Sequence, residues 1–335
     1  MTPHPSAAAK RAAILAPSVI RSSKPVGPIL LLAVCSLACS AGAAADAAVA
    51  FDESRAWRDL ESIVALGPRP PGSEELEKQR RMIEDELRAA GLAPVREPFE
   101  VKAPAEVEPQ PPGGTYAMAN VYADLPAKDA GAETVIVATH FDTKRGIPGF
   151  VGANDAGAGT AVLLELARVL ARNGPHAVTY RLLFIDGEES LRLEWRGDDN
   201  TYGSRHHAAE LKKSGAAARV RCFVLIDLCG DKDLRFLRET YSDRRLNELF
   251  IEAAKKAGLG RHVDGKNQEA RDDHLSFMAI GIPSIDLIDF DYGPDNAWWH
   301  TKDDTLDKCS AASLGATGRI VLAGLAEVEK TFRRR

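Results

Sequence analysis

TVIVATHFD, residues 134–142, is an almost continuous apolar run that ends in a histidine and an aspartate. Three more segments have the same form: RLLFIDGEE at 181–189, CFVLIDLCG at 222–230 and PSIDLIDFD at 283–291. Continuous apolar runs of this length are typical of strands that are buried on both faces of a parallel sheet. The four segments therefore predict a central, mostly parallel sheet.

Segments with apolar residues at helical spacing follow the first three runs, at 159–174, 204–215 and 243–258, and another closes the chain at 310–332. Two more helical patterns, at 56–67 and 73–92, precede residues 93–101 and 118–125, which have the pattern of antiparallel edge strands. This order predicts an α/β fold: a doubly wound, mostly parallel central sheet with antiparallel edge strands and helices on both faces. We expect residues 47–335 to form a single domain.

Residues 1–46 have the features of an export signal. A basic segment precedes an apolar run of ~10 residues that starts at Ile29, and an alanine-rich tract follows. The run is too short to cross a bilayer as a helix, so no membrane span is expected in the mature chain. Two outcomes stay open, cleavage within the alanine tract or lipid attachment at Cys39, and both place the protein outside the cytoplasm, in the periplasm or secreted.

The composition is that of a soluble globular protein, with 335 residues, 45% hydrophobic and a net charge of −5. The absence of a basic excess argues against a nucleic-acid partner. Beyond the signal only Cys222, Cys229 and Cys309 remain, an odd number that does not suit a disulfide framework. Cys222 and Cys229 are an odd number of residues apart on one predicted strand, so we expect them on opposite faces.

Carboxylates and histidines stand where the predicted strands end. His140 and Asp142 follow the first run, Glu188 and Glu189 the second, and Asp227 the third. In an open α/β sheet the ligand site lies beyond the carboxyl ends of the strands, so we expect these side chains to meet. Loops add further groups of the same kind: Asp155, Asp272, Asp273, His274, Trp298, Trp299 and His300. Hard oxygens with imidazoles and no clustered cysteine suit a catalytic Zn²⁺ or a similar divalent metal.

Each of these residues has a simpler interpretation. A lone histidine such as His140 is more often structural than a ligand, and Asp155 could cap the helix that follows it. For Asp227 the simpler interpretation, a solvated surface carboxylate, fits poorly, because it lies inside an apolar run, where a carboxylate needs a partner. His206 and His207 read as surface residues of an amphipathic helix. Convergence on one edge of the predicted sheet favours the functional interpretation of the others.

We expect the adjacent glutamates Glu188 and Glu189 to have different roles. Successive side chains at a strand end point to different sides, so one carboxylate can bind metal while the other faces the substrate as a proton carrier. Neighbouring charges raise the pKa of one of them, which makes a glutamate usable as a base and an acid near neutral pH.

Several motifs together resemble the zinc aminopeptidase superfamily: THFD at 139–142, GANDAGAGTAVLLELARVL at 152–170, FIDGEES at 184–190, LIDLCG at 225–230 and WHT at 299–301. The resemblance runs from about Trp57 to the C-terminus. Within that superfamily the chain is most similar to the glutaminyl cyclases, the glutaminyl-peptide cyclotransferases. The features that favour this branch are DGEES followed by Trp195, YGSRH at 202–206, DDH at 272–274, and Trp299 directly before His300.

The resemblance implies a single Zn²⁺ held by Asp155, Glu189 and His300. It also implies that Glu188 is the general acid and base. The remaining roles follow in the same way: Asp227 and Asp272 form a carboxylate hydrogen-bond network beside Glu188, and Trp195 and Trp299 line the pocket. In the aminopeptidase relatives His140 and Asp227 help to hold a second zinc, so a dinuclear site stays open.

The implied reaction is the conversion of N-terminal glutamine in peptides or proteins to pyroglutamate with release of ammonia. The alternatives are an exported aminopeptidase with two zinc ions, and a non-catalytic peptide-binding protein that keeps the fold. The surface is compatible with a monomer.

Overall fold

The computed structural model describes residues 48–333 and contains a six-stranded sheet in the order β1-β2-β4-β3-β5-β8. Neighbours among β4, β3, β5 and β8 pair parallel, whereas β1 pairs antiparallel with β2 and β2 with β4. The strands are β1 (Val95–Lys102), β2 (Thr115–Leu125), β3 (Thr134–His140), β4 (Thr179–Ile185), β5 (Val220–Asp227) and β8 (Ser284–Ile288). The predicted mostly parallel sheet with antiparallel strands at its edge is confirmed.

The burial of the strands explains their composition. Every residue of β5 and β8 is buried, as expected for parallel strands that are covered on both faces. The edge strand β1 instead has a mixed pattern in which a single residue, Val101, is buried. A separate two-stranded parallel ribbon joins β6 (Arg238–Glu239) to β7 (Asn267–Gln268), and these two-residue strands were not predicted.

Within residues 48–333, seven α-helices surround the sheet: α1 (Glu53–Val64), α2 (Glu74–Ala89), α3 (Gly159–Asn173), α4 (Tyr202–Ser214), α5 (Arg244–Lys256), α6 (His274–Met278) and α7 (Ala311–Thr331). Short helical turns are η1 (Pro112–Gly114), η2 (Ala153–Ala158), η3 (Ala216–Arg219), η4 (Gly260–His262), η5 (Pro294–Asn296) and η6 (Leu306–Lys308). The sequence predicts all of the α-helices except α6. The side chains of Asp52, Ser73, Asp243 and Ser310 accept backbone N–H bonds at the N-termini of four of them.

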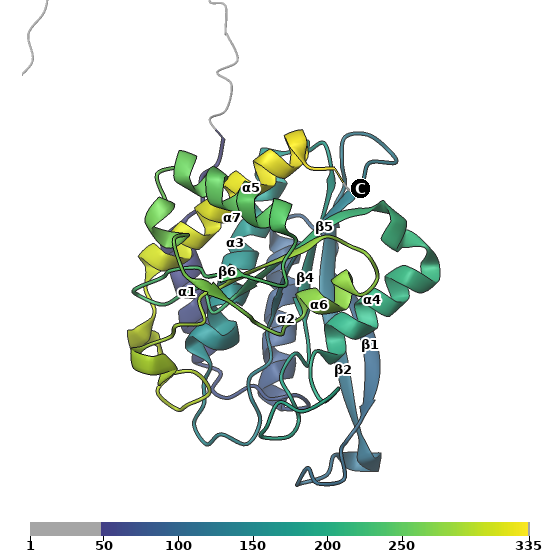
Figure 1. Ribbon diagram of the computed structural model, residues 1–335. Helices are drawn as coiled ribbons and strands as arrows, with labels where there is room; N and C mark the ends of the chain where they lie inside the picture. Colours follow the sequence, from purple (N-terminus) through teal and green to yellow (C-terminus); the bar gives the residue numbers. More distant parts are fainter. Residues whose placement is uncertain (1–47, 334–335) are drawn as a thin grey trace, which may run out of the picture. The chain divides into compact units, whose positions relative to one another are not determined.

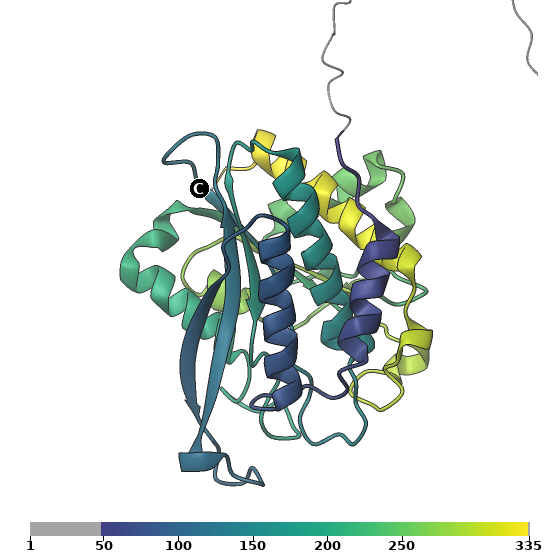
Figure 2. The same ribbon diagram turned by 180° about the vertical axis from the view of Figure 1, so that it is seen from behind.

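Helices cover both faces of the sheet, as predicted (Figures 1 and 2). On β3, Val135 and Val137 pack in the larger core with apolar residues of α1, α2, α3, α5 and α7. Ile136 and Ala138 point the other way, into a smaller core with residues of α4 and α6. Full burial of a Val, Leu, Ile or Phe side chain contributes roughly 1.5–3 kcal/mol relative to exposure, so a one-residue slip of register would be costly on both faces.

The closing helix α7 is long and apolar enough to cross a membrane by length and composition, and it is the one such helix among residues 48–333. Its buried residues include Leu314, Ile320, Val321 and Leu325, all in the larger core. It packs beside α5, α1 and α3. These contacts are those of a core helix.

Two expectations about buried residues were wrong. Cys222 and Cys229 lie in the same core rather than on opposite faces, because β5 ends at Asp227 and the left-handed backbone of Leu228 breaks the alternation. Cys309 shares this core, and none of the three thiols forms a disulfide among residues 48–333. His207 is buried rather than on the surface, with Nδ1 2.9 Å from Oε2 of Glu97 on β1.

The predicted export signal at 1–46, with Cys39, lies outside the described residues.

Candidate active site

The carboxyl ends of the parallel strands bring the predicted site together. His140 is the last residue of β3 and Asp227 the last of β5, and the loop after β4 carries Glu188 and Glu189. A cavity of about 170 Å³ lies at this edge. The resemblance gave nine residues a role at the site, and eight of them line the cavity: Asp155, Glu188, Glu189, Trp195, Asp227, Asp272, Trp299 and His300. The ninth, His140, is buried behind them with 1% of its surface exposed.

Asp155, Glu189 and His300 form one compact group of ligand atoms, all within 4.8 Å of one another. Nε2 of His300 lies 2.9 Å from Oε1 of Glu189 and 3.4 Å from Oδ2 of Asp155. Oδ2 of Asp155 and Oε2 of Glu189 are buried without a hydrogen-bond partner among the described residues. Two carboxylates and an imidazole with unsatisfied buried oxygens fit a Zn²⁺ ion, which takes such N and O ligands.

A second group shares Asp155. Nε2 of His140 lies 3.3 Å from Oδ1 of Asp155 and 3.2 Å from Oδ1 of Asp227. Asp155 thus presents one oxygen to each histidine. Burial opposes ionisation of Asp155, but its close contacts with the imidazoles of His140 and His300 outweigh burial and lower its pKa. The residues for two adjacent metal positions are therefore present.

Asp155 does not cap the helix that follows it. The chain enters η2 at Gly152, whose φ of 53° places an added Cβ 2.0 Å from the backbone oxygen of Asp155, so this position requires glycine. The helix α3 starts at Gly159 without a side-chain cap. The carboxylate is directed at the two histidines instead, which favours the functional interpretation.

Glu188 is a carboxyl group suited to proton transfer. It has 7% of its surface exposed, and Oε2 lies 3.7 Å from Nδ1 of His140. Burial raises its pKa well above the usual value; the charge of His140 opposes this, and those of Glu189 and Asp272 add to it. A carboxyl group with a raised pKa can carry a proton near neutral pH.

The two glutamates diverge for a reason that differs from the prediction. β4 ends at Ile185, so strand alternation does not set the direction of Glu188 and Glu189. The turn at Gly187, with φ of 70°, does. The carboxylate of Asp142 then accepts the backbone N–H groups of Glu188 at 3.1 Å and of Glu189 at 3.2 Å. Asp142 therefore holds the loop that carries the two glutamates.

Three supporting side chains were not predicted to have these roles. Asp304 accepts the N–H groups of Asn154 at 2.8 Å and Asp155 at 3.0 Å, and the hydroxyl of Tyr292 donates to Asp304 at 2.7 Å. Lys144, buried to 3% exposure, places Nζ 3.6 Å from Oε2 of Glu189. The sequence signal for Asp304 and Lys144 is their position a few residues after His300 and His140.

Asp272 lies beside Glu188 and Asp227 in the cavity wall. Burial raises its pKa to about 7, and the charge of Asp227 adds to this. The N–H group of Asp273 donates to Oδ1 of Asp272 at 2.5 Å. Behind Asp272, His274 is fully buried with Nε2 3.3 Å from Oε2 of Glu239. The bond from the N–H group of Asp273 thus holds the carboxylate of Asp272 at the cavity wall.

Aromatic rings form the apolar part of the cavity. Trp299 stacks on His300 with ring centroids 3.9 Å apart and meets Phe290 edge-on at 4.9 Å. His300 has φ of 52°, an unusual backbone conformation for a residue other than glycine. Trp195, with 37% of its surface exposed, stands at the mouth. The cavity therefore has one apolar wall and one wall of carboxylates.

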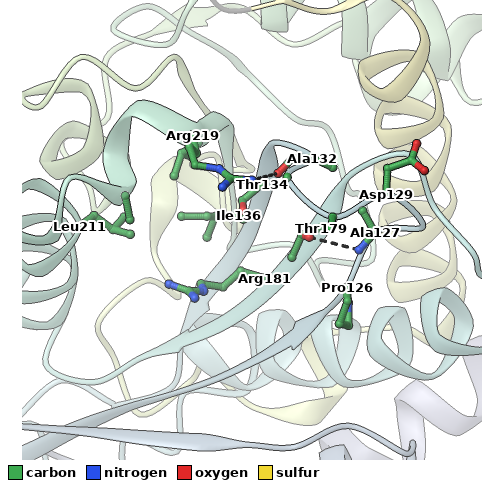
Figure 3. A pocket seen from close by; sticks show the side chains of 14 residues that line it. Pro126, Ala127, Asp129, Ala132, Thr134, Ile136, Thr179, Arg181, Leu211 and Arg219 are labelled. Carbon is green, nitrogen blue, oxygen red and sulfur yellow. Dashed lines mark hydrogen bonds between the residues drawn. The ribbon is translucent and has the colours of Figure 1, made fainter.

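A second hollow, of about 250 Å³, lies at the opposite edge of the sheet (Figure 3). Thr134 and Thr179, the first residues of β3 and β4, line it, as does Arg219 before β5. Among the described residues of its lining there is no histidine or cysteine and one carboxylate, Asp129. This hollow lacks the groups for the chemistry described above.

The chain matches the sequence pattern of Peptidase family M28 over residues 120–325. It is 32% identical over 308 residues to a glutaminyl-peptide cyclotransferase-like protein of the mouse, Mus musculus, covering 83% of this chain and 76% of that protein. It is similar to the crystal structure of a glutaminyl cyclase from an Acidobacteriales bacterium, with a TM-score of 0.78, 32% identity and coverage of 86% of this chain and 98% of that one.

The glutaminyl cyclase of Porphyromonas gingivalis is also similar, with a TM-score of 0.71, 26% identity and coverage of 83% of this chain and 98% of that one. The family match over residues 120–325 includes every residue that lines the cavity. The chain therefore belongs to peptidase family M28, a zinc-dependent family, and within it to the glutaminyl cyclases.

Proposed function

We propose that this protein converts the N-terminal glutamine of peptides or proteins to pyroglutamate and releases ammonia. The observation that carries the proposal is the meeting of Glu188, the ligand group around His300 and the two tryptophans in one small cavity. The names of its relatives favour this reaction over peptide hydrolysis.

Asp155, Glu189 and His300 would hold a single Zn²⁺, since their ligand atoms lie within 4.8 Å of one another and two buried oxygens lack partners. When bound, the ion supplies Lewis acidity toward the side-chain amide carbonyl of the substrate. Lys144 beside Glu189 and Asp304 behind Asp155 hold the two carboxylates in place.

Glu188 moves the proton. It accepts a proton from the α-amine of the substrate as that nitrogen attacks the side-chain amide carbon, and a new C–N bond closes the five-membered ring. It then gives a proton to the amide nitrogen as the original C–N bond breaks, so that ammonia leaves. A proton relay of this kind contributes roughly 10²–10⁴ in rate. Asp227 and Asp272 hold the proton-carrying carboxyl in a fixed position.

The cavity suits a small uncharged group. Its volume of about 170 Å³ admits one short side chain, and Trp299 offers a flat apolar surface to the amide and the lactam ring. Closure by Trp195 would limit the water beside Glu188, which favours attack by the amine over hydrolysis.

An aminopeptidase with two zinc ions is the second candidate. The observation in its favour is the group of His140, Asp155 and Asp227, which could hold a second ion beside the first. Peptide hydrolysis needs an activated water, and a two-metal site supplies one readily. A non-catalytic peptide-binding protein is a third candidate, but it would have no need of Glu188 in its buried position.

One experiment separates the three candidates. The purified protein is incubated with a glutaminyl peptide and, separately, with a leucyl chromogenic substrate. Ammonia and a blocked N-terminus identify a cyclase, a free amino acid identifies a peptidase, and tight binding without a product identifies a binding protein. Zinc measured per chain adds an independent test, with one ion expected for the cyclase and two for the peptidase.

We infer further that the protein is exported through residues 1–46 and acts as a monomer. Fractionation of expressing cells should place it outside the cytoplasm. A Cys39→Ser variant distinguishes the two processing routes, because loss of membrane association in that variant alone would indicate lipid attachment. Light scattering of the mature protein tests the monomer.

A further inference from the structure

A groove of about 650 Å³ continues from the active-site cavity. Trp195, Arg271 and Asp272 belong to the walls of both, so the two hollows adjoin at these residues. The cavity itself accommodates little more than one residue. If it holds the N-terminal glutamine of a peptide, the residues that follow must leave through the mouth, and the groove extends from that point.

Two helices form the groove. On α4 the residues Arg205, Ala208 and Lys212 face it, at a spacing of three and four positions that places them on one side of the helix. α6 and the residues just beyond it contribute Leu275 and Ile280. α4 and α6 lie side by side (Figure 1). The groove therefore has an apolar floor and charged rims.

The cations of the groove lack carboxylate partners. Among the described residues, the side chains of Lys212 and Arg271 have no hydrogen bond or ion pair. Within the same described part of the chain, the guanidinium of Arg205 donates only to backbone oxygens of 198, 200 and 201. By contrast, the adjacent Lys213, which is outside the groove, pairs with Glu210 at 3.0 Å.

The groove has fewer exposed acidic residues than exposed cations in its lining. Asp272 is buried and belongs to the catalytic cavity, which leaves Asp198 as the exposed carboxylate of the groove. Glu269 lies on the cavity side and accepts the hydroxyl of Tyr241 at 3.1 Å. Three exposed cations therefore face a hollow with one exposed carboxylate, in a chain whose overall charge is negative.

We propose that this groove binds the residues that follow the N-terminal glutamine of the substrate and selects acidic side chains there. The inference rests on the proposed cyclase function. The guanidinium of Arg271 has the planar fork that matches a carboxylate, and it stands where the first residues after the glutamine emerge. Lys212 lies farther along α4 and would act on a later residue.

The test uses three peptides with the same length and an amidated C-terminus: Gln-Ala-Glu-Glu-Ala, Gln-Ala-Ala-Ala-Ala and Gln-Ala-Lys-Lys-Ala. Ammonia release gives kcat and KM for each. We expect kcat/KM for the acidic peptide to exceed that of the basic one by about tenfold, mainly through KM. The ratio should shrink at high ionic strength, because exposed charges are screened.

Variants assign the preference to the groove. Lys212→Gln should reduce the acidic-to-basic ratio by roughly two- to fivefold, and Lys212→Glu should reduce it further. Lys213→Gln is the matched control, since it removes the same charge one position along the helix from a residue outside the groove. It should leave the ratio at the wild-type value.

Equal kcat/KM for the three peptides would overturn the proposal, and so would a ratio that Lys213→Gln lowers as much as Lys212→Gln. Both results leave the cyclase function standing, because the neutral peptide is still converted. If no glutaminyl peptide releases ammonia, the proposed function fails and the groove proposal fails with it.

Discussion

The carboxylate of Asp142 accepts the backbone N–H group of Glu188 at 3.1 Å. Its other oxygen accepts the N–H group of Glu189 at 3.2 Å, so a single side chain at the end of β3 holds both glutamates. An amide in its place has one acceptor oxygen, and its NH₂ group would face an N–H donor. Asp142 therefore holds the loop of the site in place, although its side chain does not line the cavity.

We expect Asp142→Asn to lower kcat by about 10²-fold, because small displacements of a proton-carrying group have effects of that size. The free energy of unfolding should fall by about 1–3 kcal/mol, the cost of a buried donor without a partner. Steady-state kinetics and urea unfolding measure the two effects. Asp129→Asn, an exposed aspartate at the opposite edge of the sheet, is the control. Wild-type kcat in Asp142→Asn would contradict the assigned role.

Substitutions of Glu188 and Glu189 should affect proton transfer and metal binding separately. Glu188→Gln should retain the fold and zinc but lose about 10²–10⁴ in kcat. Glu189→Ala should lose zinc, because it removes one ligand of three. Metal analysis and activity are measured on both variants, with the exposed Glu194→Gln as a control. Full turnover in Glu188→Gln would refute its role as general acid and base.

The sheet could be predicted from the sequence because β3, β4, β5 and β8 are buried on both faces. Their sequences therefore consist mostly of apolar residues. The site followed from the same feature, since the carboxyl ends of parallel strands share one edge. The five-residue helix α6 and the two-residue strands β6 and β7 are too short for a periodic pattern.

The supports of the site could not be predicted in the same way. Asp304 bonds to backbone about 150 positions earlier in the chain, and Asp142 bonds to backbone 46 and 47 positions later. Such contacts depend on how loops approach one another in space. The prediction for Cys222 and Cys229 failed for a related reason. Side chains alternate between the two faces of a sheet only while the backbone is extended, and the backbone of Leu228 is not extended.

Tyr292 supports Asp155, one of the proposed zinc ligands, through Asp304. Its buried hydroxyl donates to Asp304 at 2.7 Å, and Asp304 in turn accepts the N–H group of Asp155. We expect Tyr292→Phe to weaken zinc binding by about 10-fold, since groups that orient ligands commonly contribute 10- to 100-fold. Competition with a chelator measures the affinity.

The control for Tyr292→Phe is Tyr180→Phe. The hydroxyl of Tyr180 donates to Glu329 at 2.6 Å, a similar bond near the start of β4 and far along that strand from the site. Both variants lose a hydroxyl–carboxylate bond, which is buried at Tyr292 and partly buried at Tyr180, and both should lose stability. Equal zinc affinity in the two variants would show that Asp304 does not orient Asp155.

The pH dependence of stability tests the protonation state of Asp289, which is not one of the proposed zinc ligands. Asp289 follows β8 with 2% of its surface exposed, and burial raises its pKa to about 7, although the N–H group of Arg235 donates to it at 2.7 Å. The folded state therefore keeps a proton that the unfolded chain releases near pH 4. As the pH rises from about 4 to about 7, this residue lowers the free energy of unfolding by roughly 2–4 kcal/mol, and the loss levels off above that window.

Asp289→Asn cannot ionise, so the decline between about pH 4 and pH 7 should be smaller in this variant than in the wild type by that amount. Urea unfolding across the window measures the difference in slope, which is independent of any constant loss from the altered hydrogen bonds. Asp295→Asn is the control, since Asp295 is exposed and its positive φ of 54° suits asparagine. Parallel pH profiles for wild type and Asp289→Asn would show that Asp289 is already ionised in the folded protein at acidic pH, and that the bond from Arg235 outweighs its burial.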